Sequence, residues 1–160
     1  MNLFLVRHSI AEKPSPSKSD SNRGLTQEGK NIILSVSKFI KTIEPNLQLI
    51  LSSPYLRAYQ TAEIILQTFD NKIKLLKENN LAAGCTSGTL IEILNSYEEE
   101  NILIVGHQPD ISNHISNFTS NGNINLVFSP GTFAKIKFES RISYNKGMLE
   151  ILIPSEVLNK

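Results

Sequence analysis

Three short apolar runs that lead directly into polar residues are the chemically informative feature of this chain. The runs are Leu3–Val6, Leu49–Leu51 and Ile102–Val105. They are followed closely by two arginines and two histidines, namely Arg7, His8, Arg57 and His107. Because ligands of open α/β sheets bind outside the carboxyl ends of the strands, we expect these four side chains to share one crevice.

Those residue types indicate a particular chemistry. The planar guanidinium fork of arginine matches phosphate oxygens, and imidazole can act either as a neutral nucleophile or as a charged donor. Phosphoryl transfer needs in-line positioning and neutralisation of the phosphoryl oxygens more than elaborate covalent chemistry. The four residues therefore predict an anion site suited to phosphoryl transfer.

Strands and helices alternate along the chain. Thr26 is a typical helix-capping residue, and Pro45 is expected to end the helix that follows it. Further helices are predicted over 55–69, 89–97 and 109–118, and strands over 3–6, 47–51, 73–76, 102–105, 125–128, 133–138 and 148–153. This alternation predicts a three-layer α/β/α sandwich with a mainly parallel sheet and an antiparallel edge.

Composition narrows the class of protein. The 160 residues fit a single domain over 1–160, and the formal net charge of +1 argues against a broad nucleic-acid or anionic-membrane surface. No apolar stretch approaches the ~20 residues of a membrane helix, and the N-terminus shows no targeting segment. Cys85 is the only cysteine, which fits a reducing compartment. We expect a cytoplasmic protein whose oligomeric state the sequence leaves open.

The segment 13–22 (KPSPSKSDSN) is rich in serine and proline. Such a composition disfavours both a helix and a central strand. It is interpreted as a mobile loop between the first strand and the first helix, and whether it closes over a substrate stays open.

Four motifs in order resemble the histidine phosphatase superfamily, whose fold is phosphoglycerate mutase-like. They are Arg7-His8, the Arg-x-Leu-Thr-x-x-Gly element at 23–29, the stretch SPYLRAYQTA at 53–62, and VGHQP at 105–109. Any one of them is weak, whereas all four in this order are specific. The short chain looks most like the SixA-type phosphohistidine phosphatase branch.

The resemblance implies a role for each matching residue. His8 would be the nucleophile that forms a phosphohistidine intermediate, which water then hydrolyses. Arg7 and Arg57 would hold the phosphoryl oxygens, His107 would donate to one of them, and Arg23 would add a further phosphate contact. The scheme requires no metal and no cofactor. The expected partner is a phosphorylated protein, such as a histidine-containing phosphotransfer domain, or a small phosphorylated molecule.

Two positions depart from the family pattern. Ser9 stands where the family usually has glycine, so its side chain is expected to narrow the pocket or add a hydroxyl contact. Where many relatives place a glutamate as general acid, this chain offers Asn80, with Glu78 nearby, or no acid at all. An imidazole leaving group can instead be protonated on its remote nitrogen near pH ~6.5. The hypothesis is a preference for phosphohistidine over ordinary phosphate esters.

Three alternatives remain open at this point. The first is a phosphate-ester phosphatase or mutase of the same superfamily, and the second is a non-catalytic module that binds phosphohistidine or another anion. The third is a metal-dependent hydrolase that uses His8, His107 and Glu12, although the histidines lack the i, i+4 spacing of a helical metal site. The third histidine, His114, lies outside every motif and is expected to have a surface or packing role.

Overall fold

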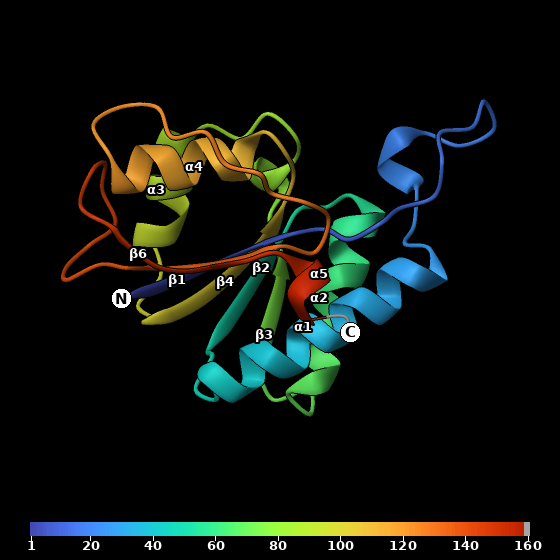
Figure 1. Ribbon diagram of the computed structural model, residues 1–160, viewed down its shortest axis with the longest axis horizontal. Coiled ribbons are helices and arrows are strands. Elements are labelled where there is room, and N and C mark those ends of the chain that lie inside the picture. The colour runs from blue at the N-terminus through green and yellow to red at the C-terminus, as the bar shows by residue number, and fades with distance from the viewer. Residues whose placement is uncertain (159–160) are drawn as a thin grey trace.

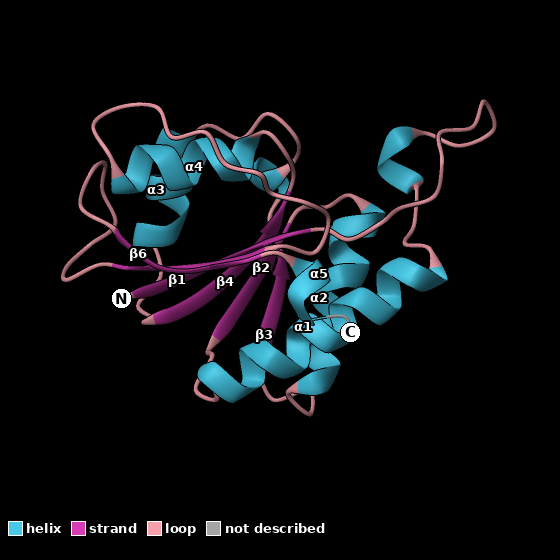
Figure 2. Ribbon diagram, viewed as in Figure 1, coloured by secondary structure: helices cyan, strands magenta, loops and turns pink. Residues whose placement is uncertain are grey.

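A six-stranded sheet forms the centre of the molecule, seen here in a computed structural model that describes residues 1–158. The strands are β1 (Asn2–Arg7), β2 (Leu49–Ser52), β3 (Lys74–Lys77), β4 (Asn101–Gly106), β5 (Phe133–Lys137) and β6 (Met148–Ile153). Their order is β3-β2-β4-β1-β5-β6 (Figure 2). The first four strands are parallel, β5 is antiparallel to β1, and β6 is antiparallel to β5. The predicted mainly parallel sheet with an antiparallel edge is confirmed.

Helices cover both faces of this sheet. They are α1 (Gln27–Ile43), α2 (Leu56–Thr68), α3 (Ser87–Asn95), α4 (Asp110–Thr119) and α5 (Ser155–Leu158), with short 3-10 helices η1 (Asp20–Asn22) and η2 (Asn79–Leu81). Figure 1 shows α3 and α4 on one face and α1, α2 and α5 on the other. The predicted three-layer α/β/α sandwich is therefore correct.

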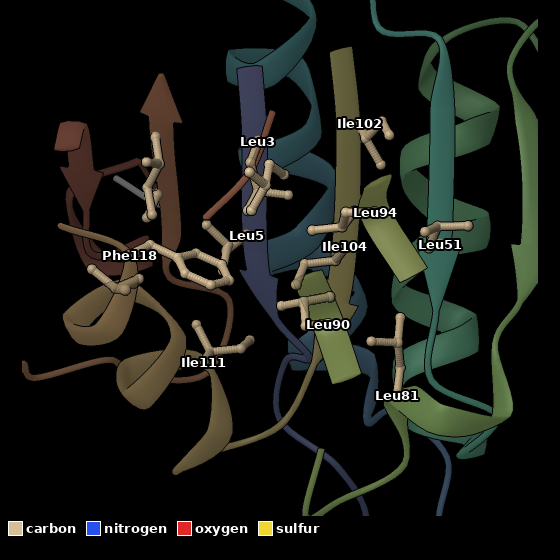
Figure 3. Close-up of a cluster of buried hydrophobic side chains, with 14 of the residues drawn as sticks. Leu3, Leu5, Leu51, Leu81, Leu90, Leu94, Ile102, Ile104, Ile111 and Phe118 are labelled. Carbon is tan, nitrogen blue, oxygen red and sulfur yellow. The ribbon is translucent and has the colours of Figure 1, made fainter. Parts of the chain in front are cut away.

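The core explains why the central strands are apolar on both faces between their polar ends. Leu3 and Leu5 of β1 belong to the cluster under α3 and α4, part of which is drawn in Figure 3. Phe4 and Val6, which point to the opposite face, pack against α1 and α2. Burying each such side chain contributes about 1.5–3 kcal/mol. Both faces thus hold β1 in place, and with it the residues that follow the strand.

The register of the parallel strands brings their carboxyl ends together. Arg7 pairs with Gly106 between β1 and β4, and Ser52 pairs with Val105 between β2 and β4. The bonding continues one residue beyond the strands, because the His8 amide donates to the Gly106 carbonyl at 3.1 Å. The residues that directly follow β1, β2 and β4 consequently lie side by side.

The segment after His8 is fixed by the start of α1. Thr26 caps this helix as predicted, since its Oγ1 accepts from the Gly29 amide at 3.0 Å, a type of bond that contributes about 1 kcal/mol. The Thr26 amide in turn donates to the Ile10 carbonyl at 2.9 Å. A Cβ at Gly29 would lie 2.3 Å from that same carbonyl oxygen, so only glycine allows the close approach.

The predicted strand at 125–128 is wrong. Residues 120–130 contain no regular element, and β1 already has β4 and β5 as its two neighbours. The apolar alternation that suggested a strand arises because Leu126 and Phe128 pack on the core beside α4. The third predicted helix begins at Ser87, two residues early, because Thr86 caps it by accepting from the Thr89 amide.

Two wider expectations concern the whole chain. The single domain over 1–160 stays a prediction, and residues 159–160 lie outside the described part. No helix within residues 1–158 has the length and apolar character needed to cross a membrane.

Candidate active site

His8 lies at the carboxyl end of β1 with both ring nitrogens engaged. Its Nδ1 lies 2.8 Å from the Ser9 carbonyl oxygen, which can only accept, so Nδ1 carries the proton. Nε2 therefore has a lone pair, and it accepts from Arg57 Nε–H at 3.1 Å. Burial lowers the pKa of His8 to about 3, a shift that the charges of His107, Arg57 and Arg7 reinforce and the bond to Ser9 opposes. The imidazole is neutral at pH 7.

His107 follows β4 and lies against His8, with 5.2 Å between the ring centroids and 61° between the ring planes. Its Nε2 is 2.7 Å from Ser53 Oγ, and that oxygen also accepts from the Tyr55 amide at 3.3 Å. Because Ser53 is fully buried, Nε2 is the available acceptor for its hydroxyl proton. This arrangement places the His107 proton on Nδ1.

The Nδ1 atom of His107 is buried and has no hydrogen-bond partner within residues 1–158. Burial also lowers the pKa of His107 to about 4, with Arg57 and Arg7 acting in the same direction and Asp20 against it. A buried donor without a partner is costly, so an anion that reached Nδ1 would bind favourably there.

Arg57 extends from the first turn of α2 into the site and is 5% exposed. Its guanidinium carbon lies 5.0 Å from the centre of the Tyr55 ring, which in turn packs against the His107 ring at 4.9 Å between centroids. Tyr55 therefore packs against both of these side chains.

Arg7 is the last residue of β1 and directly precedes His8. Its Nη1 donates to the Phe128 carbonyl at 2.7 Å, so the irregular segment 120–130 closes that edge of the site. The Nε atom of Arg7 is buried and has no partner among the described residues. Burial lowers the pKa of Arg7 from its ordinary value, yet a guanidinium group stays charged at any relevant pH.

Arg23 reaches the same place through Asp20, a residue that sequence reasoning missed. Asp20 Oδ1 accepts from Arg23 Nε at 2.8 Å and from Nη2 at 2.6 Å, while Oδ2 accepts from Arg57 Nη2 at 3.0 Å. The hydrogen bonds from Arg23 and Arg57 lower the pKa of Asp20 below its usual range. The predicted loop thus contains η1, and its end is anchored on α2 by this carboxylate.

The two departures from the family pattern have clear positions. Ser9 is fully buried and its hydroxyl has no partner within residues 1–158, whereas its backbone carbonyl accepts the hydrogen bond from His8 Nδ1–H. The Glu78 carboxylate accepts from both the amide and the side chain of Asn80, each at 3.0 Å. That carboxylate is therefore engaged in capping η2.

Three other chemically notable side chains have local partners of their own. Glu12, considered above with the two histidines as a metal ligand, bonds Lys18 and the Gly24 amide, and the Lys18 contact is the main cause of its lowered pKa. His114 is buried, bonded to Ser87 Oγ and stacked on Phe118, which is a packing role. Burial raises the pKa of Cys85 to about 11, so it is a thiol.

Comparisons with known proteins agree with this geometry. Residues 3–83 match the family described as the histidine phosphatase superfamily (branch 1). An uncharacterised protein of Picosynechococcus sp. is 31% identical over 114 residues, which cover 69% of this chain and 68% of that protein. The phosphohistidine phosphatase SixA homolog of Haemophilus influenzae is 28% identical over 155 residues, covering 89% and 92%.

The fold has solved counterparts as well. The protein histidine phosphatase SixA, whose structure was determined with tungstate, superposes with a TM-score of 0.84 over 99% of both chains at 20% identity. At that identity the likeness concerns the fold, which is of the phosphoglycerate mutase-like α/β class.

The family match covers half of the chain, and the Picosynechococcus relative extends it. The chain belongs to the histidine phosphatase superfamily, and it is a phosphatase. The predicted resemblance to SixA-type members is confirmed by the Haemophilus relative and by the fold.

Proposed function

We propose that this protein is a phosphohistidine phosphatase that removes phosphate from a phosphoprotein through a covalent intermediate on His8. One observation carries the proposal. The His8 Nδ1 proton is held by the Ser9 carbonyl, so the ring lone pair is on Nε2, where Arg57 Nε–H donates to it until a phosphoryl group takes that place.

The first step is attack by His8 Nε2 on phosphorus. The lone pair of Nε2 forms the N–P bond while the bond to the leaving group breaks, and the leaving group takes that electron pair. The proton stays on Nδ1, bonded to the Ser9 carbonyl, so the phosphorylated ring is cationic. Because the ring is cationic, it can leave phosphorus as neutral imidazole. Water then forms the new O–P bond, the N–P bond breaks with its electron pair returning to Nε2, and the protons of the water stay with the released phosphate.

The phosphoryl oxygens are neutralised by groups that are already in place. Arg57 and Arg7 supply positive charge that acts on His8, and Nδ1–H of His107 supplies a buried donor that lacks a partner within residues 1–158. Arg23, which is linked to Arg57 through Asp20, is the further phosphate contact of this proposal. Preorganised donors of this kind act where charge spreads over the transferring group.

The leaving group decides between substrates. An alkoxide leaving group needs a general acid. The Glu78 carboxylate is hydrogen-bonded to Asn80, and the Asn80 side chain is an amide, which cannot give a proton to an alkoxide. An imidazole can carry its own proton on the remote nitrogen. The Haemophilus relative is itself named a phosphohistidine phosphatase homolog, which supports this choice. The proposed substrate is a phosphorylated protein in the cytoplasm, such as a histidine-containing phosphotransfer domain.

Two alternatives are a broad phosphate-ester phosphatase of the same superfamily and a module that binds phosphohistidine without hydrolysing it. A substrate panel separates all three. Purified protein is tested on a phosphohistidine protein, phosphoaspartate, phosphotyrosine and small sugar phosphates. We expect the highest kcat/KM on phosphohistidine. Faster hydrolysis of sugar phosphates would support the phosphate-ester phosphatase. Binding of phosphohistidine without turnover would support the non-catalytic binding module.

A further inference from the structure

Asp20 places an exposed carboxylate next to a nearly buried cation. Its side chain is 57% exposed, whereas the Arg57 side chain that it bonds is 7% exposed. A second contact anchors the same residue, because Arg57 Nη1 donates to the Asp20 backbone carbonyl at 2.7 Å. The carboxylate therefore joins the buried Arg57 guanidinium to solvent, so a group that approaches Arg57 from outside can contact Asp20.

The distance from His8 can be bounded. Arg57 Nε is 3.1 Å from His8 Nε2, and Arg57 Nη2 is 3.0 Å from Asp20 Oδ2. With C–N bonds of about 1.33 Å, two guanidinium nitrogens lie about 2.3 Å apart, so Oδ2 is within roughly 8 Å of His8 Nε2.

The remote nitrogen of a bound phosphoimidazole lies at a similar distance from His8 Nε2. With reacting atoms about 3–3.5 Å apart, the remote ring nitrogen of an in-line phosphohistidine lies roughly 7 Å from the attacking nitrogen. We propose that Asp20 is a specificity-determining residue, whose carboxylate accepts a hydrogen bond from this remote nitrogen of the leaving imidazole. The proposal rests on the proposed function and names the group that recognises its substrate.

The step balances without an added acid. The substrate ring enters protonated on its remote nitrogen, with that N–H donated to Asp20. The lone pair of His8 Nε2 forms the new N–P bond, the old P–N bond breaks, and its electron pair returns to the departing ring nitrogen. The product is neutral imidazole that keeps its remote N–H, so no proton moves to or from the carboxylate.

The two imidazoles are then held alike. His8 has the Ser9 carbonyl at its remote nitrogen, and the substrate ring has Asp20 at its own. The negative charge of Asp20 favours the protonated, reactive form of phosphohistidine. The same charge repels a leaving group that develops negative charge, such as an alkoxide or a phenolate. Asp20 therefore favours phosphohistidine and disfavours esters.

The test compares Asp20→Asn with the wild-type protein on phosphohistidine and on p-nitrophenyl phosphate. Asparagine keeps the shape, an acceptor oxygen and the backbone bond to Arg57, and it removes the charge. We expect kcat/KM on phosphohistidine to fall about tenfold to 100-fold, the scale of one charge-assisted hydrogen bond at a partly exposed site. On the aryl ester, kcat/KM should stay equal or rise. Glu12→Gln, which removes a carboxylate from the same β1–α1 connection, is the control and should change neither.

The pH dependence of kcat gives a second readout, which would not change if Asp20 had only a structural role. Without the carboxylate, the protonated substrate is less favoured, so the alkaline limb of kcat on phosphohistidine should shift to lower pH by about one unit. An equal loss on both substrates would show that Asp20 only orients the arginines. A gain in kcat/KM on both substrates would show that Asp20 competes with the phosphoryl group, and no change on either would show that Asp20 does not affect activity. Each of these three results would overturn the proposal. If the wild-type protein turns over the aryl ester but not phosphohistidine, the proposed function fails instead.

Discussion

Ser53 Oγ and His107 Nε2 lie 2.7 Å apart in a fully enclosed contact, although 54 residues separate them in the chain. The serine hydroxyl accepts from the Tyr55 amide and donates to the ring, so the ring proton is on Nδ1. Ser53 therefore acts through His107 as a positioning residue, in the way that a buried partner fixes the tautomer of a catalytic histidine.

Ser53→Ala tests that role. Without the hydroxyl, the His107 ring has no partner that selects the Nδ1–H tautomer, and kcat/KM should fall about tenfold to 100-fold, less than the ~10⁴ seen where a triad tautomer is lost outright. Ser52→Ala is the matched control, because Ser52 is equally buried but donates to a backbone carbonyl. Equal losses in the two variants would show that packing, and not the tautomer, is responsible.

The protonation state of His8 is directly measurable. Since the pKa of His8 is lowered to about 3, mainly by burial, its imidazole should stay neutral with the proton on Nδ1 from pH 8 to pH 5. Imidazole ¹⁵N chemical shifts report both features. Removing the nearby charge in Arg57→Gln should raise the pKa. An ordinary titration near pH 6.5 in the wild-type protein would contradict the assigned geometry.

Stability should depend on pH through the three histidines. The pKa values of His8, His107 and His114 are lowered to about 3, 4 and 4, while unfolded histidine titrates near 6.5. Below pH 6.5 the unfolded chain binds more protons than the folded one, so the free energy of unfolding falls as the pH drops toward 4. Urea unfolding at pH 7 and pH 5 measures this.

His114→Gln isolates one contribution, since His114 lies away from the catalytic groups. The difference in unfolding free energy between pH 7 and pH 5 should become smaller in this variant. An unchanged difference would show that His114 is not held neutral in the folded state.

Gly29→Ala tests the packing that fixes the residues after His8. The new Cβ would lie 2.3 Å from the Ile10 carbonyl oxygen, a clash with backbone that the helix can relieve only by moving. We expect a loss of about 1–3 kcal/mol in the free energy of unfolding. Gly122→Ala, where nothing lies within 4 Å, should change stability far less. Similar losses for both would remove the steric argument.

Much of the site was predictable because its signals are local. An apolar run followed by Arg7 and His8 fixes a buried strand and the residues at its end, and the same holds for His107 after β4. Parallel register then places the ends together. The strand predicted at 125–128 failed because apolar alternation also arises when a chain packs irregularly on a core.

The parts that sequence reasoning missed are contacts between distant segments. Asp20 lies in a serine- and proline-rich stretch without periodicity, and its contact with Arg57 spans 37 residues. Its residue type and neighbours are those of an ordinary solvated acidic residue. A signal was nonetheless available, since Asp20 stands three residues before Arg23, a spacing at which a carboxylate can reach a guanidinium.

The covalent role of His8 is the central claim, and trapping the intermediate tests it most directly. Protein mixed with a ³²P-labelled phosphohistidine donor is quenched rapidly in alkali, which preserves phosphoimidazoles, and the labelled residue is identified by peptide mapping. We expect acid-labile label on His8 during turnover and neither label nor turnover in His8→Ala. Full turnover by His8→Ala, or label on another residue, would contradict it.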